Sequence, residues 1–122
     1  MKDNVYLAQF SLTITPGNMI FMPYAVSCVW SYAQTHDDIK EKYEMKEVFF
    51  EKLDPDDIVN SLDNPKVFAF GCYIWNCNYT DVIAQKVKEK FPECLIVYGG
   101  PQIPITAHDE WWDKHPYVDV VI

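Results

Sequence analysis

The sequence lacks several features that mark common classes of protein. Ten lysines and arginines stand against 18 aspartates and glutamates in 122 residues, which gives a formal net charge of -8. The basic residues form no cluster, which argues against nucleic acid or anionic membrane as a main partner, because phosphate groups attract clustered positive charge. The opening lacks the apolar core and cleavage site of a signal peptide, and no apolar run approaches membrane-spanning length. The protein is therefore predicted to be cytoplasmic.

Familiar nucleotide and metal motifs are also missing. No G-x-G-x-x-G follows the first predicted strand, which argues against a dinucleotide site, and there is no P-loop. The ends of the first and third predicted strands supply no acidic residues for the Mg²⁺ site of a receiver domain. Cys72 and Cys77 lack the spacing of a zinc knuckle with His108 and His115, so no metal ligands are predicted. The four cysteines are expected to be reduced.

A regular alternation of strand and helix patterns is present. Apolar, strand-favouring runs occupy five segments: 4–12, 45–53, 66–75, 93–98 and 117–122. Helical patterns fall between them at 22–34, 54–62, 81–91 and 106–116, while the charged segment 35–44 is expected to cross the surface. Such alternation predicts a parallel sheet with helices on both faces. We predict one flavodoxin-like, doubly wound (Rossmann-like) α/β domain over residues 1–122, with 45–53 at an edge and 66–75 in the centre.

The closing helix that normally follows the fifth strand of such a sheet is not found before Ile122. We therefore expect the chain to be a fragment, or a domain whose natural continuation lies downstream. One helix start is clearly marked, since Asp54 can cap the helix and Pro55 fits its first turn.

Ligands of open parallel sheets bind at the carboxyl ends of the strands. There, Gly99 and Gly100 permit close approach of the backbone, Pro101 stiffens the exit and Gln102 follows. A purely structural turn is an equally good interpretation of the two glycines. After the first strand, Ser11, Thr13 and Thr15 with Gly17 resemble a phosphate-holding loop, which keeps a flavin mononucleotide site as an alternative.

Three stretches together resemble the N-terminal cobalamin-binding-type domain of radical S-adenosylmethionine enzymes. These stretches are "GCYIWN", "KEKFPECLIVYGGP" and "HPYVDVVI", which cover most of residues 66–122, and residues 4–35 fit the strand, loop and P-Y-A helix with which that family opens. The resemblance implies a cobalamin-binding module that is not catalytic alone. The iron–sulfur cluster and S-adenosylmethionine would belong to a following barrel with a C-x-x-x-C-x-x-C motif, which this chain lacks.

The resemblance also implies which residues face the cofactor. Gly99 and Gly100 match the GG pair beside the nucleotide tail, and Cys72-Tyr73-Ile74 takes the place of an S-x-L turn, so Cys72 and Ile74 would line the tail slot. From their loop position, Tyr73, Trp75 and Asn76 would contact the corrin or the tail. The family's D-x-H-x-x-G loop is absent from "FSLTITPGN", so any bound cobalamin is expected to lack a histidine lower ligand from the protein.

A second interpretation remains open. The domain could have kept the fold and lost the cofactor, and use its aromatic residues to pack on a catalytic barrel, since a fold does not guarantee a function.

Overall fold

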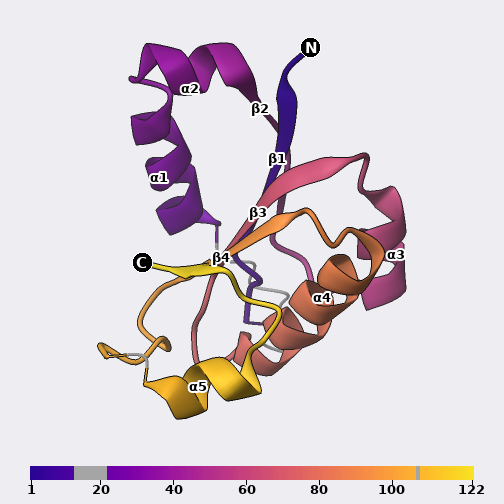
Figure 1. Cartoon of the computed structure of the whole chain (residues 1–122), viewed down its shortest axis with the longest axis vertical. Coiled ribbons are helices and arrows are strands. Elements are labelled where there is room, and N and C mark those ends of the chain that lie inside the picture. The colour runs from indigo at the N-terminus through magenta and orange to yellow at the C-terminus, as the bar shows by residue number, and fades with distance from the viewer. Residues whose placement is uncertain (13–21, 107) are drawn as a thin grey trace.

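The predicted alternation of strands and helices is found in the computed structural model, which describes residues 1–12, 22–106 and 108–122. Five parallel strands form one sheet in the order β2-β1-β3-β4-β5, which confirms the flavodoxin-like, doubly wound prediction (Figure 1). The strands are β1 (Asp3–Ala8), β2 (Tyr43–Phe49), β3 (Pro65–Gly71), β4 (Leu95–Gly99) and β5 (Val120–Val121). The helices are α1 (Tyr24–Ala33), α2 (Asp37–Lys42), α3 (Pro55–Ser61), α4 (Cys77–Lys90) and α5 (Asp109–Lys114).

Several element boundaries differ from those read in the sequence. The charged surface segment contains the short helix α2, followed directly by β2, which starts two residues earlier than predicted. Strand β3 ends at Gly71 rather than Trp75, and α4 begins at Cys77, four residues before the predicted start. The cause is a tight turn between these two elements, and Asn76 organises that turn.

Asn76 is buried and satisfies three backbone groups at the turn. Its Oδ1 accepts a hydrogen bond from the Tyr73 amide at 2.8 Å, and its Nδ2 donates to the carbonyl oxygens of Gly71 at 3.0 Å and Phe10 at 3.1 Å. These bonds hold the ends of β1 and β3 together, because buried backbone groups need partners.

The start of α3 follows the sequence signal. The Asp54 carboxylate accepts a hydrogen bond from the Asp56 amide at 2.9 Å, and Pro55 occupies the first helical position. This is the cap predicted from the sequence.

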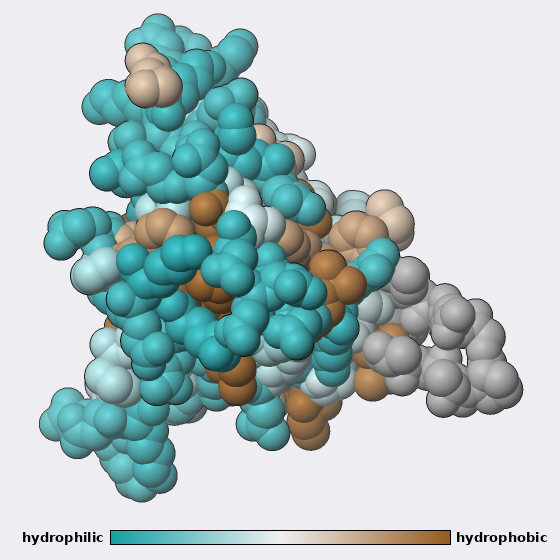
Figure 2. Space-filling model, turned by 90° about the vertical axis from the view of Figure 1, so that its right-hand side faces the viewer, coloured by the Kyte–Doolittle hydropathy of each residue, from teal (hydrophilic) through white to brown (hydrophobic). Residues whose placement is uncertain are grey.

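One face of the sheet carries most of the core. Helices α3, α4 and α5 pack there on the inward side chains of β1, β3 and β4, among them Phe68, Phe70 and Tyr98. Ile83 and Val87 are fully buried on the inner side of α4, as their helical spacing predicts. The surface on this side is mostly hydrophilic (Figure 2). No helix among the described residues is long and apolar enough to cross a membrane.

The opposite face carries only α1 among the described helices that pack on the core. Val26 of α1 packs with Val5 and Leu7 of β1, and Trp30 lies against the same small cluster. Among the described residues, side chains beyond α1 on this face are exposed: Leu95 is 40% exposed and Ile122 is 75% exposed. The difference between the two faces leaves room for a pocket beside α1.

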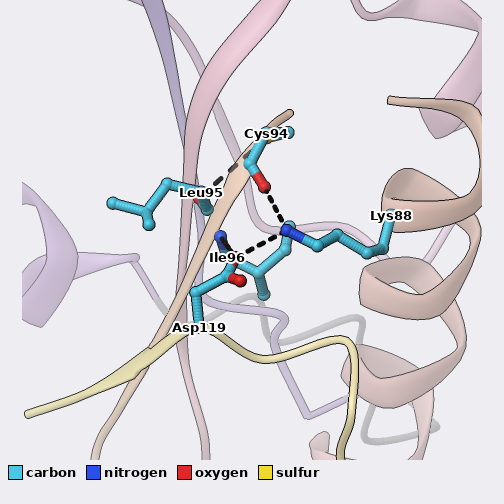
Figure 3. A network of polar contacts seen from close by, with 5 residues as sticks. All are labelled: Lys88, Cys94, Leu95, Ile96 and Asp119. Atoms are coloured by element: carbon cyan, nitrogen blue, oxygen red, sulfur yellow. Dashed lines mark hydrogen bonds and ion pairs between the residues drawn. The ribbon is translucent and has the colours of Figure 1, made fainter. Parts of the chain in front are cut away.

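A polar network fixes the approach to β5. The Lys88 ammonium donates to the Asp119 carboxylate at 2.8 Å and to the Cys94 carbonyl oxygen at 2.9 Å (Figure 3). The same carboxylate oxygen accepts a hydrogen bond from the Ile96 amide at 2.8 Å. One side chain thereby ties α4 and β4 to the segment that leads into the edge strand.

Candidate functional site at the carboxyl ends of the strands

A pocket lies between α1 and the carboxyl-terminal halves of β1, β3 and β4. We call it the α1 pocket; its volume is about 300 Å³. Its walls are apolar apart from backbone groups and one tyrosine: Leu7, Ala25, Val26, Val29, Ala69, Phe70, Gly71, Tyr73, Val97, Gly99, Gly100 and Ile122. A pocket at this end of an open parallel sheet is where ligands of such folds bind.

Two glycines face the α1 pocket from neighbouring strands. Gly71 of β3 pairs with Gly99 of β4 in the parallel ladder. Residues paired in register lie on the same face of a sheet, and this face is the one toward α1. The two positions therefore present bare backbone to the pocket. In the sequence Gly71 is the first residue of the family-like stretch "GCYIWN", but no role was predicted for it; its other signal is a glycine at the end of an apolar strand, which marks close approach of another group.

Gly100 has a different role from Gly99. Its φ of 107° lies in the left-handed region, and a Cβ atom there would be 2.6 Å from the Cys72 carbonyl oxygen and 2.9 Å from the Cys72 amide nitrogen. The Cys72 amide also donates to the Gly99 carbonyl oxygen at 2.6 Å, and the Gln102 amide donates to the Cys72 carbonyl oxygen at 3.2 Å. The turn after β4 is thus locked onto the end of β3, and only glycine fits at position 100.

The Cys72 side chain is on the other face of the sheet from the α1 pocket. It is 1% exposed and belongs to the main core, and with Gln102 it lines a second pocket of about 340 Å³ between α4 and the loop after β4. Burial raises the pKa of the Cys72 thiol to about 12, so the thiol is protonated at neutral pH. The S-x-L comparison implies that the Cys72 side chain lines the tail slot. In the structure that side chain points away from the α1 pocket.

The second pocket, which we call the α4 pocket, has a polar centre. The Tyr98 hydroxyl donates to the Asp81 carboxylate at 2.8 Å, and His115 Nε2 lies 3.7 Å from its other oxygen. Burial, followed by the charge of Asp81, raises the pKa values of Tyr98 and Tyr117. Cys77 also lines this pocket. Among the described residues, no group of three or more His, Cys, Asp or Glu side chains is placed to hold a metal ion.

The loop after β3 places two aromatic rings at the mouth of the site. The rings of Tyr73 and Trp75 stack with 4.6 Å between centroids and 12° between planes. Trp75 is held by its indole N–H, which donates to the Phe10 carbonyl oxygen at 3.2 Å, and by Lys52, whose ammonium donates to the Trp75 carbonyl oxygen at 2.6 Å. Between the two rings in sequence, Ile74 is 77% exposed. The turn thus offers a flat aromatic surface beside the α1 pocket.

The remaining predicted site residues are dispersed. Ser11 is buried beyond the end of β1, its amide donates to the Phe50 carbonyl oxygen at 2.8 Å, and it does not line the α1 pocket. Pro101 lines a third pocket, of about 560 Å³, together with Gly100. Thr13, Thr15 and Gly17, on which the flavin alternative depends, lie outside the described residues. Of the predicted set, the α1 pocket brings together Tyr73, Gly99 and Gly100.

Comparison with known proteins identifies relatives of this chain. It is 33% identical over 101 residues to the cobalamin-dependent radical SAM methyltransferase TokK of Streptomyces tokunonensis. It is 31% identical over 102 residues to the 2-(S-pantetheinyl)-carbapenam-3-carboxylate methyltransferase of Streptantibioticus cattleyicolor. The matches cover 83% and 84% of this chain, and the chain spans about 15% of the length of each relative. No family model matches the sequence. These relatives confirm the resemblance to radical S-adenosylmethionine enzymes of the cobalamin-dependent type.

Proposed function

We propose that this chain, a relative of part of the cobalamin-dependent radical S-adenosylmethionine methyltransferases, is a cobalamin-binding module that is not catalytic alone. The observation that carries the proposal is the pair Gly71 and Gly99, which clears the floor of an apolar pocket at the carboxyl ends of β3 and β4. The nucleotide tail of cobalamin would enter the α1 pocket, and the corrin would lie across the strand ends. This is the end of an open parallel sheet at which ligands bind.

The residues present fit that ligand. The pocket volume of about 300 Å³ is at the lower end of the range for small-molecule sites, which suits one flat base rather than the whole cofactor. Its walls are apolar, so an aromatic base would be buried against Leu7, Val26 and Val97 at little polar cost. The stacked rings of Tyr73 and Trp75 would offer a flat contact to the corrin at the mouth.

The cobalt lower ligand is the second part of this proposal. None of the described residues that line the α1 pocket is a histidine. The segment between β1 and α1, residues 9–23, also contains no histidine, and we propose that the cobalamin would be held without an imidazole from the protein. When bound, cobalamin would supply methyl-transfer chemistry, while Gly71, Gly99 and the Tyr73–Trp75 pair would hold and orient it.

The rest of the reaction would need further parts. The proposed partner is a downstream barrel domain that holds an iron–sulfur cluster and S-adenosylmethionine. Support comes from the Streptomyces tokunonensis relative, which is named a radical SAM methyltransferase and of whose length this chain spans about 15%. Methyl transfer would then depend on how the barrel faces the carboxyl edge of this sheet.

A second candidate function is that of an interaction domain of the same fold without cofactor. It is favoured by the exposed apolar side chains of α1, since Tyr24 is 76% exposed, Val29 56% and Tyr32 69%. An exposed apolar surface of this kind marks contact with another protein part. In this alternative the outer side of α1 would pack on the catalytic barrel.

Titration of the purified chain with hydroxocobalamin tests the proposal. The visible spectrum of the cobalt complex and tryptophan fluorescence would both be followed, with flavin mononucleotide titrated in parallel. Saturable binding of cobalamin and not of flavin supports a cobalamin module. Absence of cobalamin binding, both by this chain and by a form extended through the next domain, would favour the interaction domain.

A further inference from the structure

We infer that Gly71 determines the size of the group that the α1 pocket admits, and that it does so for the tail of the cofactor and not for the corrin. This inference rests on the proposed function. It concerns a residue to which the family resemblance assigns no role: the stretch "GCYIWN" begins with Gly71, but the S-x-L comparison begins at Cys72.

The first step concerns why position 71 is glycine. Its φ is outside the left-handed region, so an L-residue could adopt the same backbone. A Cβ atom there would meet the Gln9 and Val26 side chains at 3.4 Å, which is ordinary van der Waals contact. The fold therefore has room for a methyl group at Gly71, in contrast to Gly100, where the backbone excludes one.

The second step concerns what glycine costs at this position. A glycine in a strand weakens the strand, because the unfolded chain gains freedom and no side chain packs. Gly71 nevertheless ends the central strand of the sheet and is buried. A residue that costs stability and is not required by the backbone is explained by the space that it leaves open, which here belongs to the α1 pocket.

The third step concerns the shape of that space. Gly71 and Gly99 lie side by side at the carboxyl ends of their strands, and one pair deeper on the same face are Ala69 and Val97. Val26 borders the space on the α1 side and Ile122 borders it beyond β4, where it lies 3.1 Å from a Cβ atom placed at Gly99. The result is a slot whose floor is bare peptide at the mouth and small side chains below. A flat aromatic group can lie against such a floor.

A side chain at position 71 would project into the mouth of this slot. An alanine methyl fills part of it, and a valine, which suits a strand, fills more. Steric misfit of about one methylene changes discrimination by a pocket about tenfold or more. The corrin lies outside the slot in the proposed arrangement, so its own contacts would not change.

The experiment compares two ligands on three variants. Cobalamin carries the nucleotide tail, whereas cobinamide has the corrin and lacks the base. Affinities for both are measured by tryptophan fluorescence and visible absorption for the unaltered chain, Gly71→Ala and Gly71→Val. The matched control is Ser31→Val, which adds the same branched side chain at an exposed position of α1 outside the pocket. Circular dichroism and thermal unfolding report whether each variant is folded.

We expect Gly71→Val to bind cobalamin about tenfold or more weakly, with Gly71→Ala in between, and cobinamide to bind all variants about equally. The Ser31→Val variant should bind cobalamin and cobinamide with the same affinities as the unaltered chain. Equal losses for both ligands, or no loss with Gly71→Val, would overturn the assignment of Gly71 while leaving the cobalamin proposal in place. If the unaltered chain and its extended form bind neither ligand, the proposed function fails and this inference fails with it. If Gly71→Val does not fold, the ratio of the cobalamin affinity to the cobinamide affinity of Gly71→Ala decides the question in the same way.

Discussion

Replacing Gly100 with alanine should destabilise the fold far more than the same change at Gly99. At Gly100 the φ of 107° costs a non-glycine residue about 1–3 kcal/mol. The added Cβ would also lie 2.6 Å from the Cys72 carbonyl oxygen, so the turn must move. That movement disturbs the two hydrogen bonds that join Cys72 to Gly99 and Gln102, each contributing about 1 kcal/mol. The expected loss of unfolding free energy is about 2–5 kcal/mol.

The matched change, Gly99→Ala, would place a methyl group against a side chain that can move. A Cβ atom there lies 3.1 Å from the Ile122 side chain, which is 75% exposed and free to move aside. The expected loss for Gly99→Ala is below about 1 kcal/mol.

Urea unfolding followed by tryptophan fluorescence measures the difference. With an m-value of about 1–2 kcal/mol per molar urea, Gly100→Ala should lower the midpoint by about 1 M or more, and Gly99→Ala by less. A Gly100→Ala variant within about 0.5 kcal/mol of the unaltered chain would refute the reasoning, because neither the left-handed backbone nor the contact with Cys72 would then matter. Loss of cobalamin binding in a Gly100 variant would also be uninformative about the pocket, since the turn itself is expected to change.

Three further changes test other parts of the structure. Asp119→Ala should lower the unfolding free energy measured in urea by about 1–3 kcal/mol, because the Ile96 amide and the Lys88 ammonium lose their shared acceptor. A loss near zero would show that water takes the place of the Asp119 carboxylate. At pH 7.5 iodoacetamide should modify the exposed Cys28 rapidly and Cys72 only after unfolding, because burial raises the pKa of the Cys72 thiol to about 12. Mass spectrometry of digests measures the labelling of each cysteine, and early labelling of Cys72 would contradict its burial. The stability linked to this raised pKa is fully present below the pKa of the unfolded thiol, near 9, and is lost as the pH rises toward 12. Over that pH range the urea midpoint should therefore fall less steeply for Cys72→Ala than for the unaltered chain.

The order and direction of the strands could be predicted from the sequence because they follow from local patterns. Five apolar runs alternate with helical segments, and right-handed crossovers then leave few topologies. The short helix α2 was missed because five of its six residues are charged and its one apolar residue, Ile39, makes no periodic pattern. The length of β3 was overestimated because Cys72 to Trp75 are as apolar as the strand itself. The strand ends where Asn76 bonds to Gly71 and Tyr73, and the third Asn76 bond, to the Phe10 carbonyl oxygen, joins residues 66 apart in sequence, which no local pattern shows.

The candidate site was only partly predictable, for a physical reason that the three glycines illustrate. All three stand at the carboxyl ends of strands, and a sequence cannot separate their roles. What separates them is the φ angle at Gly100, the Ile122 side chain near Gly99 and the pocket beside Gly71. A family pattern aligned on Cys72 also cannot show that this side chain is directed to the opposite face of the sheet from Gly71.

The two proposed functions differ in the part of the open face that each would cover. A nucleotide tail would occupy the slot between Val26 and Ile122, over the paired glycines, and would leave the outer side of α1 in solvent. A protein partner would cover the outer side of α1, where Tyr24 and Tyr32 are exposed, and it has no need for bare backbone at Gly71 and Gly99. The exposed side chains of α1 therefore do not weigh against a cofactor, because a domain of a longer enzyme can use both surfaces. The pairing of Gly71 with Gly99 on the pocket floor is explained by a bound ligand, whereas an interaction domain without a cofactor gives no physical reason for it.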